Sequence, residues 1–203
     1  MSDPGPSAEA SLPRAEQRRL GILDATLRVI AAGGVDAVTH RRVAAEAGAS
    51  LGATTYYFES RDAMVLEAFR YYIARSMSEL AALEREMNAL DPEALIDLAV
   101  EFTRREFTDP ELIRAEYELI VYASRDDDLA REFRTWQRAL DGQIAEAFEQ
   151  LGAPNPMDAA RTVSGICRAF ELECLTHPGR DTDHLRRRLA LVMPCLLGVA
   201  GSG

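Results

Sequence analysis

Apolar residues recur at steps of three and four positions along most of the chain, which is the spacing of one buried face of an α-helix. The first run covers residues 20–30 and stops at Gly33-Gly34, where a C-terminal cap is expected. The most regular run comprises Leu129, Phe133, Trp136, Leu140, Ile144, Phe148 and Leu151. The β-prone segment 54–57 is too short to stand as a strand. The pattern therefore predicts an all-α protein.

Capping residues and prolines divide these runs into about nine helices. Thr39 and Ser50 are N-cap candidates for two short helices that end near residues 47 and 56, and Gly48 lies in a turn expected to need a positive φ. Two helices open at the Asp-Pro pairs 91–92 and 109–110. The others are predicted over residues 20–33, from 61 to 83 or beyond, along the regular run at 129–151, and over 157–176 and 184–200.

Residues 39–58 have the spacing of a helix-turn-helix. Ala44 lies where the first helix approaches the second closely, so a small side chain is expected there. The residues that the second helix would turn wholly or partly outward are Ser50, Leu51, Ala53, Thr54 and Tyr56. Hydroxyls and N-terminal amides of such a helix suit phosphate oxygens, its methyl groups suit thymine, and Arg41, Arg42 and Arg61 supply positive charge from the sides. An ordinary helical hairpin in an all-α domain would explain the same spacing.

The charge of the chain is uneven along its length. Among its 203 residues the net charge is −10, with 23 basic residues against 33 acidic ones. Residues 1–60 hold six arginines and seven acids, and residues 61–203 hold the remaining 17 and 26. This balance excludes a protein coated in basic surface but permits a local nucleic-acid site near the N-terminus. We expect a disordered tail over residues 1–13, a DNA-binding domain over 14–60 and a second helical domain over 61–200.

Several classes of protein receive no support from the sequence. No apolar run is long enough for a membrane span, no signal peptide is expected, and three cysteines fit a reducing compartment, so a cytoplasmic location is predicted. None of the three histidines lies in a catalytic or metal motif, so neither an enzyme nor a cofactor is predicted. Cys167, Glu171, Cys174 and His177 share a helical face, which leaves a metal or redox site as a minor alternative.

The segment GGVDAVTHRRVAAEAGASLGATTYYFESRDAMVLEAF, residues 33–69, resembles the DNA-binding domain of the TetR-type bacterial transcriptional regulators. The resemblance implies that Thr39 contacts backbone phosphate, that residues 50–57 form the recognition helix and that Arg61 grips phosphate. The expected DNA-binding residues are Thr39, Arg41, Arg42, Ser50, Leu51, Gly52, Ala53, Thr54, Thr55, Tyr56, Tyr57 and Arg61. The family usually has Leu then Tyr where this chain has Thr54-Thr55, so the bases that are read stay open.

The family also implies a homodimeric repressor that binds a palindromic DNA operator and is released by a small-molecule inducer. A helical ligand-binding or scaffold protein whose helix-turn-helix does not bind DNA is the alternative. The predicted ligand-pocket residues are Phe102, Glu116, Tyr117, Ile120, Trp136, Phe148 and Phe170. For Glu116, a carboxylate on an apolar helical face, pairing with an arginine or a position at the edge of that face is favoured over a ligand contact.

Dimerisation is expected through the last two predicted helices, which have broad apolar faces. Their apolar residues are Val163, Ile166, Phe170 and Cys174 in one helix and Leu185, Leu189, Val192, Met193, Leu196 and Leu197 in the other. Paired with their two-fold copies, these faces would form a four-helix interface. Burial of the same faces within a monomer is the competing explanation.

Overall fold

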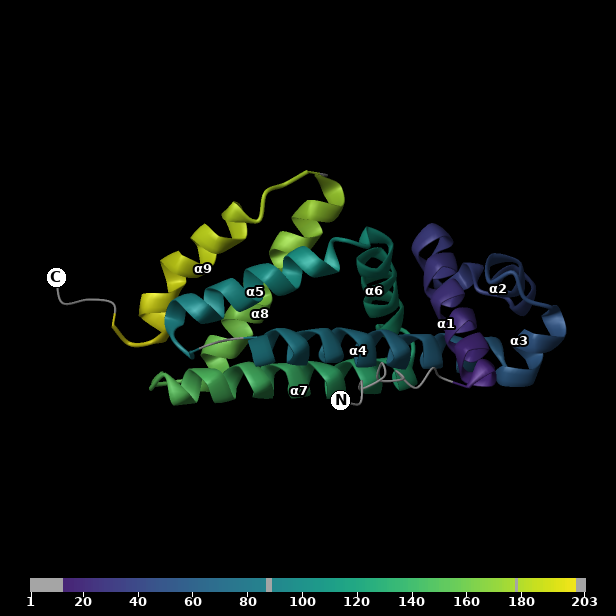
Figure 1. The fold of residues 1–203 in the computed structure, drawn as a ribbon, viewed down its shortest axis with the longest axis horizontal. Coiled ribbons are helices and arrows are strands. Elements are labelled where there is room, and N and C mark those ends of the chain that lie inside the picture. Colours follow the sequence, from purple (N-terminus) through teal and green to yellow (C-terminus); the bar gives the residue numbers. More distant parts are fainter. Residues whose placement is uncertain (1–12, 87–88, 178, 200–203) are drawn as a thin grey trace, which may run out of the picture.

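The computed structural model describes residues 13–86, 89–177 and 179–199, and in these ranges the chain forms helices joined by turns (Figure 1). The nine α-helices of the described residues are α1 (Arg14–Gly33), α2 (His40–Glu46), α3 (Leu51–Tyr57), α4 (Arg61–Glu86), α5 (Pro92–Glu106), α6 (Pro110–Ala123), α7 (Asp127–Gln150), α8 (Pro156–Thr176) and α9 (Asp183–Leu196). A 3₁₀ helix, η1 (Val35–Ala37), follows α1 and was not predicted. The predicted all-α class is confirmed. The predicted N-terminal tail lies almost entirely outside the described residues.

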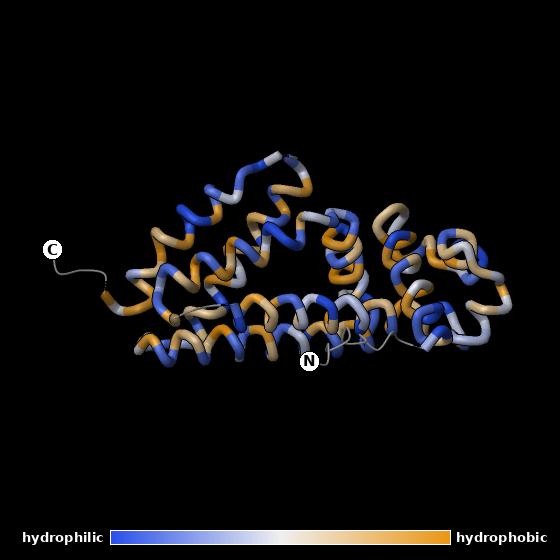
Figure 2. Tube along the Cα trace, viewed as in Figure 1, coloured by the Kyte–Doolittle hydropathy of each residue, from blue (hydrophilic) through white to orange (hydrophobic). Residues whose placement is uncertain are grey.

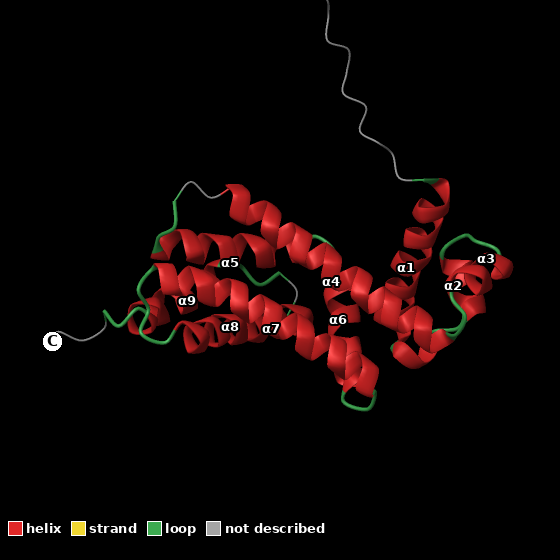
Figure 3. Ribbon diagram, turned by 90° about the horizontal axis from the view of Figure 1, so that it is seen from below, coloured by secondary structure: helices red, strands yellow, loops and turns green. Residues whose placement is uncertain are grey.

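The molecule is elongated, and α1, α2 and α3 form a head at one end (Figure 1). Helix α4 leaves the head and runs beside α7, while α5, α8 and α9 form the opposite end (Figures 1 and 3). Helix α6 stands between the two ends and packs against α1. Helix α4 is therefore one continuous element that reaches from the head into the second half of the molecule.

Polar caps begin several of these helices, as the sequence predicts. The Asp91 carboxylate accepts a hydrogen bond from the Ala94 amide at 2.8 Å, and Asp126 accepts one from the Leu129 amide at 2.9 Å. Proline at the first position of α5 and α6 suits a helix start because its missing N–H would have no partner there. The last helix is shorter than predicted, because α9 ends at Leu196 and not near residue 200. Pro194 has no amide hydrogen to donate within this last turn, and Gly198 follows the helix with a φ of 71°.

Two clusters of buried apolar side chains stabilise the fold. The first joins the head to α4, α6 and the first half of α7, with members from Ile22 to Trp136. The second joins α5, α7, α8 and α9 around Phe148 and Phe170. In Figure 2 apolar segments alternate with polar ones along every long helix, as expected for helices with one buried face.

Half of the apolar residues assigned to the dimer interface are buried within the chain itself. The members of those faces that are less than 9% exposed are Val163, Phe170, Leu185, Leu189 and Met193. They belong to the second cluster and pack with Ile96 of α5 and Phe148 of α7. The assignment of these residues to an intersubunit contact was therefore wrong, because α5 and α7 already cover them. Among the described residues, no helix combines the length and apolar character that a membrane span requires.

Candidate nucleic-acid interface and internal cavity

The turn between α2 and α3 is built as its sequence predicts. The Thr39 hydroxyl oxygen accepts a hydrogen bond from the Arg42 amide at 3.1 Å, and the Ser50 hydroxyl oxygen accepts one from the Ala53 amide at 3.2 Å. Each cap satisfies an amide that the helix leaves unpaired. Between them, Gly48 takes a φ of 59°, which confirms the expected left-handed conformation. Ala44 is buried, so its small side chain allows α2 and α3 to pack closely.

The outer face of α3 exposes unusually large side chains. Tyr56 is 82% exposed and Leu51 is 52% exposed, although both are large residues with apolar area. Gly52 and Thr55 lie exposed on the same short helix, while Ala53 and Tyr57 are half-buried. The Tyr56 and Tyr57 rings meet edge to face with centroids 5.1 Å apart. A large exposed aromatic on a surface that also offers hydroxyls is suited to contact with a partner.

Thr54 differs from the prediction because it is fully buried. Its hydroxyl donates to the Leu51 carbonyl at 2.9 Å and lies 3.4 Å from the His40 carbonyl. Helix α3 has only seven residues, and Thr54 is on the side that packs against α2. The expectation that the Thr54 side chain faces outward was therefore wrong.

Arginines surround the exposed end of the helix-turn-helix. Arg41 and Arg42 are exposed on α2, as predicted. Two further arginines, Arg14 and Arg18, line a hollow of about 640 Å³ between the start of α1 and the turn that leads to Ser50. The sequence analysis missed these two, although their separation of four positions places them on one face of α1. The head therefore carries exposed arginines at the start of α1, beside the N-terminus of α3, and on α2.

Arg61 lies at the first position of α4 and has internal partners. Its guanidinium donates to the Val35 carbonyl at 2.8 Å and lies 3.3 Å from the Asp36 carboxylate. It also contacts the Tyr122 hydroxyl of α6 at 3.4 Å and the Asp62 carboxylate at 2.8 Å. These contacts join the start of α4 to η1 and to α6.

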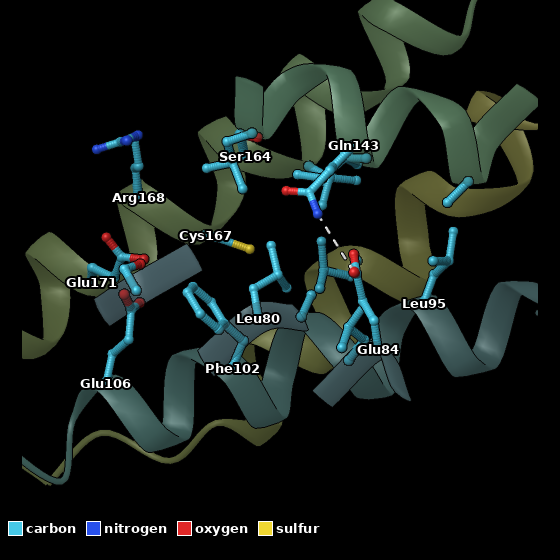
Figure 4. Close-up of a pocket in the computed structure, with 18 of the residues that line it drawn as sticks. Leu80, Glu84, Leu95, Phe102, Glu106, Gln143, Ser164, Cys167, Arg168 and Glu171 are labelled. Atoms are coloured by element: carbon cyan, nitrogen blue, oxygen red, sulfur yellow. Dashed lines mark hydrogen bonds between the residues drawn. The ribbon is translucent and has the colours of Figure 1, made fainter. Parts of the chain in front are cut away.

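A cavity of about 110 Å³ lies in the second half of the molecule, between α4, α5, α6, α7, α8 and α9. Four of the predicted pocket residues line it, namely Phe102, Glu116, Trp136 and Phe148. Tyr117, Ile120 and Phe170 do not line it; Phe170 is fully buried in the second cluster. The polar lining residues that the sequence analysis did not assign to the pocket are Ser76, Glu84, Glu106, Gln143, Ser164, Arg168 and Glu171. Figure 4 shows Glu106, Arg168 and Glu171 at one end and Glu84 with Gln143 at the other.

Arg168 makes several contacts at the end of the cavity that also holds Glu106 and Glu171. Its guanidinium donates to the Glu116 carboxylate at 3.2 Å and to the Gln137 side-chain oxygen at 3.0 Å. The same guanidinium lies 5.2 Å from the centroid of the Trp136 ring. The Tyr72 hydroxyl of α4 donates to the other Glu116 oxygen. The predicted pairing of Glu116 with an arginine is confirmed, and the pair links α4, α6, α7 and α8.

The remaining two carboxyls at this end have raised proton affinity. Burial, helped by the nearby Glu116 carboxylate, raises the pKa of Glu171 to about 7, while a hydrogen bond from the Tyr117 hydroxyl at 2.8 Å opposes the shift. Burial and the neighbouring Glu171 and Glu116 raise the pKa of Glu106 well above its usual range. Burial also raises the pKa of Glu116, against the effect of Arg168. At this end of the cavity burial therefore favours protonated carboxyl groups, and Glu171 is the one whose pKa lies near neutral pH.

The cysteines do not form a reactive or metal-binding group. Burial raises the pKa of the Cys167 thiol to about 12, so the thiol stays protonated and weakly nucleophilic. Cys174 is partly buried and its pKa is also raised, while His177 is exposed next to Thr176. Within the described part of the chain, no three His, Cys, Asp or Glu side chains come together as ligands of one metal ion.

Comparison with known proteins relates both halves of the chain to one family. Residues 22–68 match the model of bacterial regulatory proteins of the tetR family, and residues 90–194 match that of the tetracyclin repressor-like C-terminal domain. The HTH-type transcriptional regulator BetI of Brucella suis biovar 1 is 31% identical over 134 residues, which cover 66% of this chain and 67% of BetI.

Solved structures share the fold. A transcriptional regulator from Rhodococcus sp. Rha1 superposes with a TM-score of 0.77 at 20% identity, over 89% of this chain and 96% of that one. A member of the TetR family from Streptomyces coelicolor A3 superposes with a TM-score of 0.65 at 28% identity, over 90% of this chain and 99% of that one. At such identities the likeness of the first structure concerns the fold alone.

Proposed function

The chain belongs to the TetR family of bacterial regulatory proteins, and from this membership we propose that it is a repressor that binds a palindromic DNA operator as a homodimer and is released by a small molecule. The relatives that it matches are transcriptional regulators and not enzymes. The observation that carries the proposal is the surface of the head, where an exposed, uncharged α3 is flanked by exposed arginines.

In this proposal α3 enters the major groove. Leu51, Thr55 and Tyr56 supply methyl, hydroxyl and aromatic groups to base edges and sugars, which need no charge. The capped N-terminus of α3 and the Thr39 hydroxyl face phosphate. The arginines grip the backbone on either side of the groove and supply the electrostatic part of the affinity. Thr54 takes no part in base contacts because it is buried.

A dimer is expected because a palindromic site offers two half-sites to two heads. The faces of α8 and α9 that remain free in the monomer carry small and apolar residues. On α8 these are Gly165, Ala169 and Leu172, which is 48% exposed; on α9 they are Leu191, which is 79% exposed, and Cys195. Packed against their two-fold copies, these faces would remove the exposed leucines from water.

The internal cavity is the proposed effector site. Helix α4 begins at the head with Arg61 and lines the cavity further along with Ser76, Leu80 and Glu84. A ligand that shifts α4 therefore changes the position of the head, and with it the spacing of the two recognition helices. A coupling free energy of about 1–3 kcal/mol between the two sites is enough for such regulation.

The test is fluorescence anisotropy of the full chain with DNA fragments tiled across the region around its own gene, at two or more salt concentrations. We expect tight binding to one palindromic fragment that weakens steeply with salt. Arg41→Ala and Arg18→Ala should each reduce the slope of log affinity against log salt by about 0.9. Arg104→Ala is the matched control, since this exposed arginine lies on α5 and pairs with Glu101. Salt-insensitive or absent binding across a genome-wide DNA selection would favour the helical ligand-binding alternative.

A further inference from the structure

The cavity has more carboxyl groups than the fold neutralises. Glu106 of α5 and Glu171 of α8 lie at one end with Arg168, the cationic side chain of the lining (Figure 4). Glu116 of α6, which pairs with Arg168, belongs to the same end. Arg168 forms its ion pair with Glu116. Among the described residues, Glu106 and Glu171 form no ion pair with an arginine, and Glu171 has only the Tyr117 hydroxyl and the more distant field of Arg168. The buried Glu171 and the half-buried Glu106 are therefore left without a counter-charge of their own, which is costly in an apolar cavity.

Other polar atoms of the lining also lack partners. Trp136 is only 6% exposed and lines the cavity, and its indole N–H has no acceptor within the described chain. The side-chain oxygen of Gln143 is likewise buried and unpaired at the opposite end. Buried polar atoms in folded proteins are nearly always hydrogen-bonded, so these two atoms indicate a polar occupant of the cavity.

The middle of the cavity is apolar. Leu80 of α4 and Phe102 of α5 lie between the two polar ends (Figure 4), and Ile144 of α7 and Met193 of α9 also line the cavity. A second hollow, of about 310 Å³, shares Ser76, Phe102 and Glu106 with the cavity and has exposed residues such as Arg75 on its rim. Glu106 thus lines both the internal cavity and the second hollow, whose rim is exposed to solvent.

We propose that the effector of this protein is an organic cation with an apolar body, and that its positive group binds between Glu106 and Glu171. The proposal rests on the proposed function of the cavity as the effector site. Glu106 and Glu171 form no ion pair within the described chain, and the positive group of the effector supplies that counter-charge. Its N–H groups donate to the carboxylate oxygens. The apolar body replaces water along Phe102 and Leu80.

Proton release should accompany this binding. Burial favours the protonated form of Glu106 and Glu171 in the free protein and raises the pKa of Glu171 to about 7. A bound cation favours the ionised form, so a proton leaves the carboxyl group for solvent as the cation enters. The titratable and charged groups that face Glu171 are Tyr72 on α4, Glu106 on α5, Glu116 and Tyr117 on α6, and Cys167, Arg168 and Cys174 on α8. Helix α7 contributes the uncharged Trp136.

Isothermal titration calorimetry of the full chain without DNA tests the proposal with three probes of one shape. These are 4-phenylbutylamine, 4-phenylbutan-1-ol and 4-phenylbutyrate, which are cationic, neutral and anionic near neutral pH. We expect the amine to bind at least about tenfold more tightly than the alcohol, and the carboxylate to bind most weakly. The affinity for the amine should fall severalfold from about pH 8 to about pH 6, while the affinity for the alcohol stays flat.

Glutamine variants locate the positive group. Glu171→Gln and Glu106→Gln keep the shape of the side chain, and each should lower the affinity for the amine about tenfold without changing that for the alcohol. Glu84→Gln, at the other end of the same cavity, is the matched control and should leave the affinity for the amine within about twofold. A thermal melt of each variant shows that it is folded.

The outcomes separate the two proposals. Equal binding of amine and alcohol, preferred binding of the carboxylate, no binding of the amine, or amine affinity that both glutamine variants leave unchanged would overturn the cation site. None of these results bears on the repressor proposal, because the binding of operator DNA is measured separately and without the probes. Cation binding by a protein that binds no DNA would instead support the site and contradict the repressor.

Discussion

Replacing Arg168 by methionine should destabilise the protein strongly at neutral pH and much less in mild acid. Methionine keeps the unbranched aliphatic part of the side chain and the helix propensity of α8 but removes the guanidinium group and its charge. The Glu116 side chain, which is 3% exposed, would then lose its ion pair at 3.2 Å. It keeps the hydrogen bond from the Tyr72 hydroxyl. A buried carboxylate with no counter-charge takes up a proton, so the cost of the substitution is set by the cost of protonation.

The magnitude follows from the ordinary pKa of glutamate, about 4.3, at a cost of about 1.4 kcal/mol for each pH unit above it. From its ordinary pKa, protonating Glu116 would cost about 3.7 kcal/mol at pH 7 and about 1 kcal/mol at pH 5. Burial already raises the pKa of Glu116 in the unsubstituted protein, so these values are upper bounds. Loss of the Gln137 hydrogen bond and of the stacking on Trp136 adds about 1 kcal/mol at either pH. We therefore expect Arg168→Met to lower the free energy of unfolding by at most about 4–5 kcal/mol at pH 7 and by at most about 2 kcal/mol at pH 5, with the larger loss at pH 7.

The sign of this pH dependence follows from linkage. A carboxyl group whose pKa is higher in the folded state than in the unfolded state is most favourable to folding below its unfolded pKa, and this contribution is lost as the pH rises. The variant should therefore regain stability relative to the unsubstituted protein as the pH falls from 7 to 5. Glu171, whose pKa is already raised to about 7, adds a smaller effect in the same direction because Arg168 also opposes its shift.

The free energy of unfolding at pH 7 and at pH 5 is measured by urea denaturation, which is followed by far-ultraviolet circular dichroism at one fixed protein concentration. Glu116→Gln combined with Arg168→Met is the control, since it removes the buried charge together with its partner. The double variant should lose only about 1–2 kcal/mol at pH 7. An equal loss at both pH values, or a double variant no more stable than Arg168→Met alone, would refute the assignment of Glu116 as a charge held by Arg168.

Three further predictions concern the head, the start of α4 and the dimer. Gly48→Ala should lower the free energy of unfolding by about 1–2 kcal/mol in thermal denaturation because φ is 59° there, whereas Gly21→Ala, on an open face of α1, should have no such cost. Arg61→Ala should weaken binding to all DNA sequences and lower the salt slope by about one unit; an unchanged slope would assign Arg61 to its internal contacts alone. Leu191→Glu should convert a dimer to monomers in sedimentation velocity, while Val121→Glu, equally a charge placed on an exposed apolar residue but on α6, should leave the dimer intact.

Local chemistry explains why so much of the fold is predictable from the sequence. A helix start depends on the few residues that cap it, so Thr39, Ser50 and Asp91 mark their helices without reference to the rest of the chain. The turn at Gly48 is similarly local, because only glycine adopts its φ without strain. These features place the helix-turn-helix in the sequence before any contact between distant residues is known.

The errors arise where a partner distant in sequence decides the outcome. Periodicity shows that α8 and α9 have apolar faces, but it does not show that α5 and α7 cover those faces. The seven residues of α3 are too few to reveal that Thr54 packs against α2. For Glu116 the sequence predicts an arginine partner, whereas the choice of Arg168, 52 positions away, is made by the packing of α6 against α8.

The Arg168 network also suggests how charge in the cavity reaches the head. Tyr72 connects it to α4, which is the same helix that begins at Arg61 beside η1 and α6. Arg168 faces Glu116, Glu171 and Tyr117, so a cation next to Glu171 changes the field that holds Arg168 against Glu116. Since Glu116 anchors Tyr72, a change in that ion pair acts on α4 directly. The position of the head would then depend on the protonation and charge of a few buried acids, and not on contacts made along the whole length of the helix.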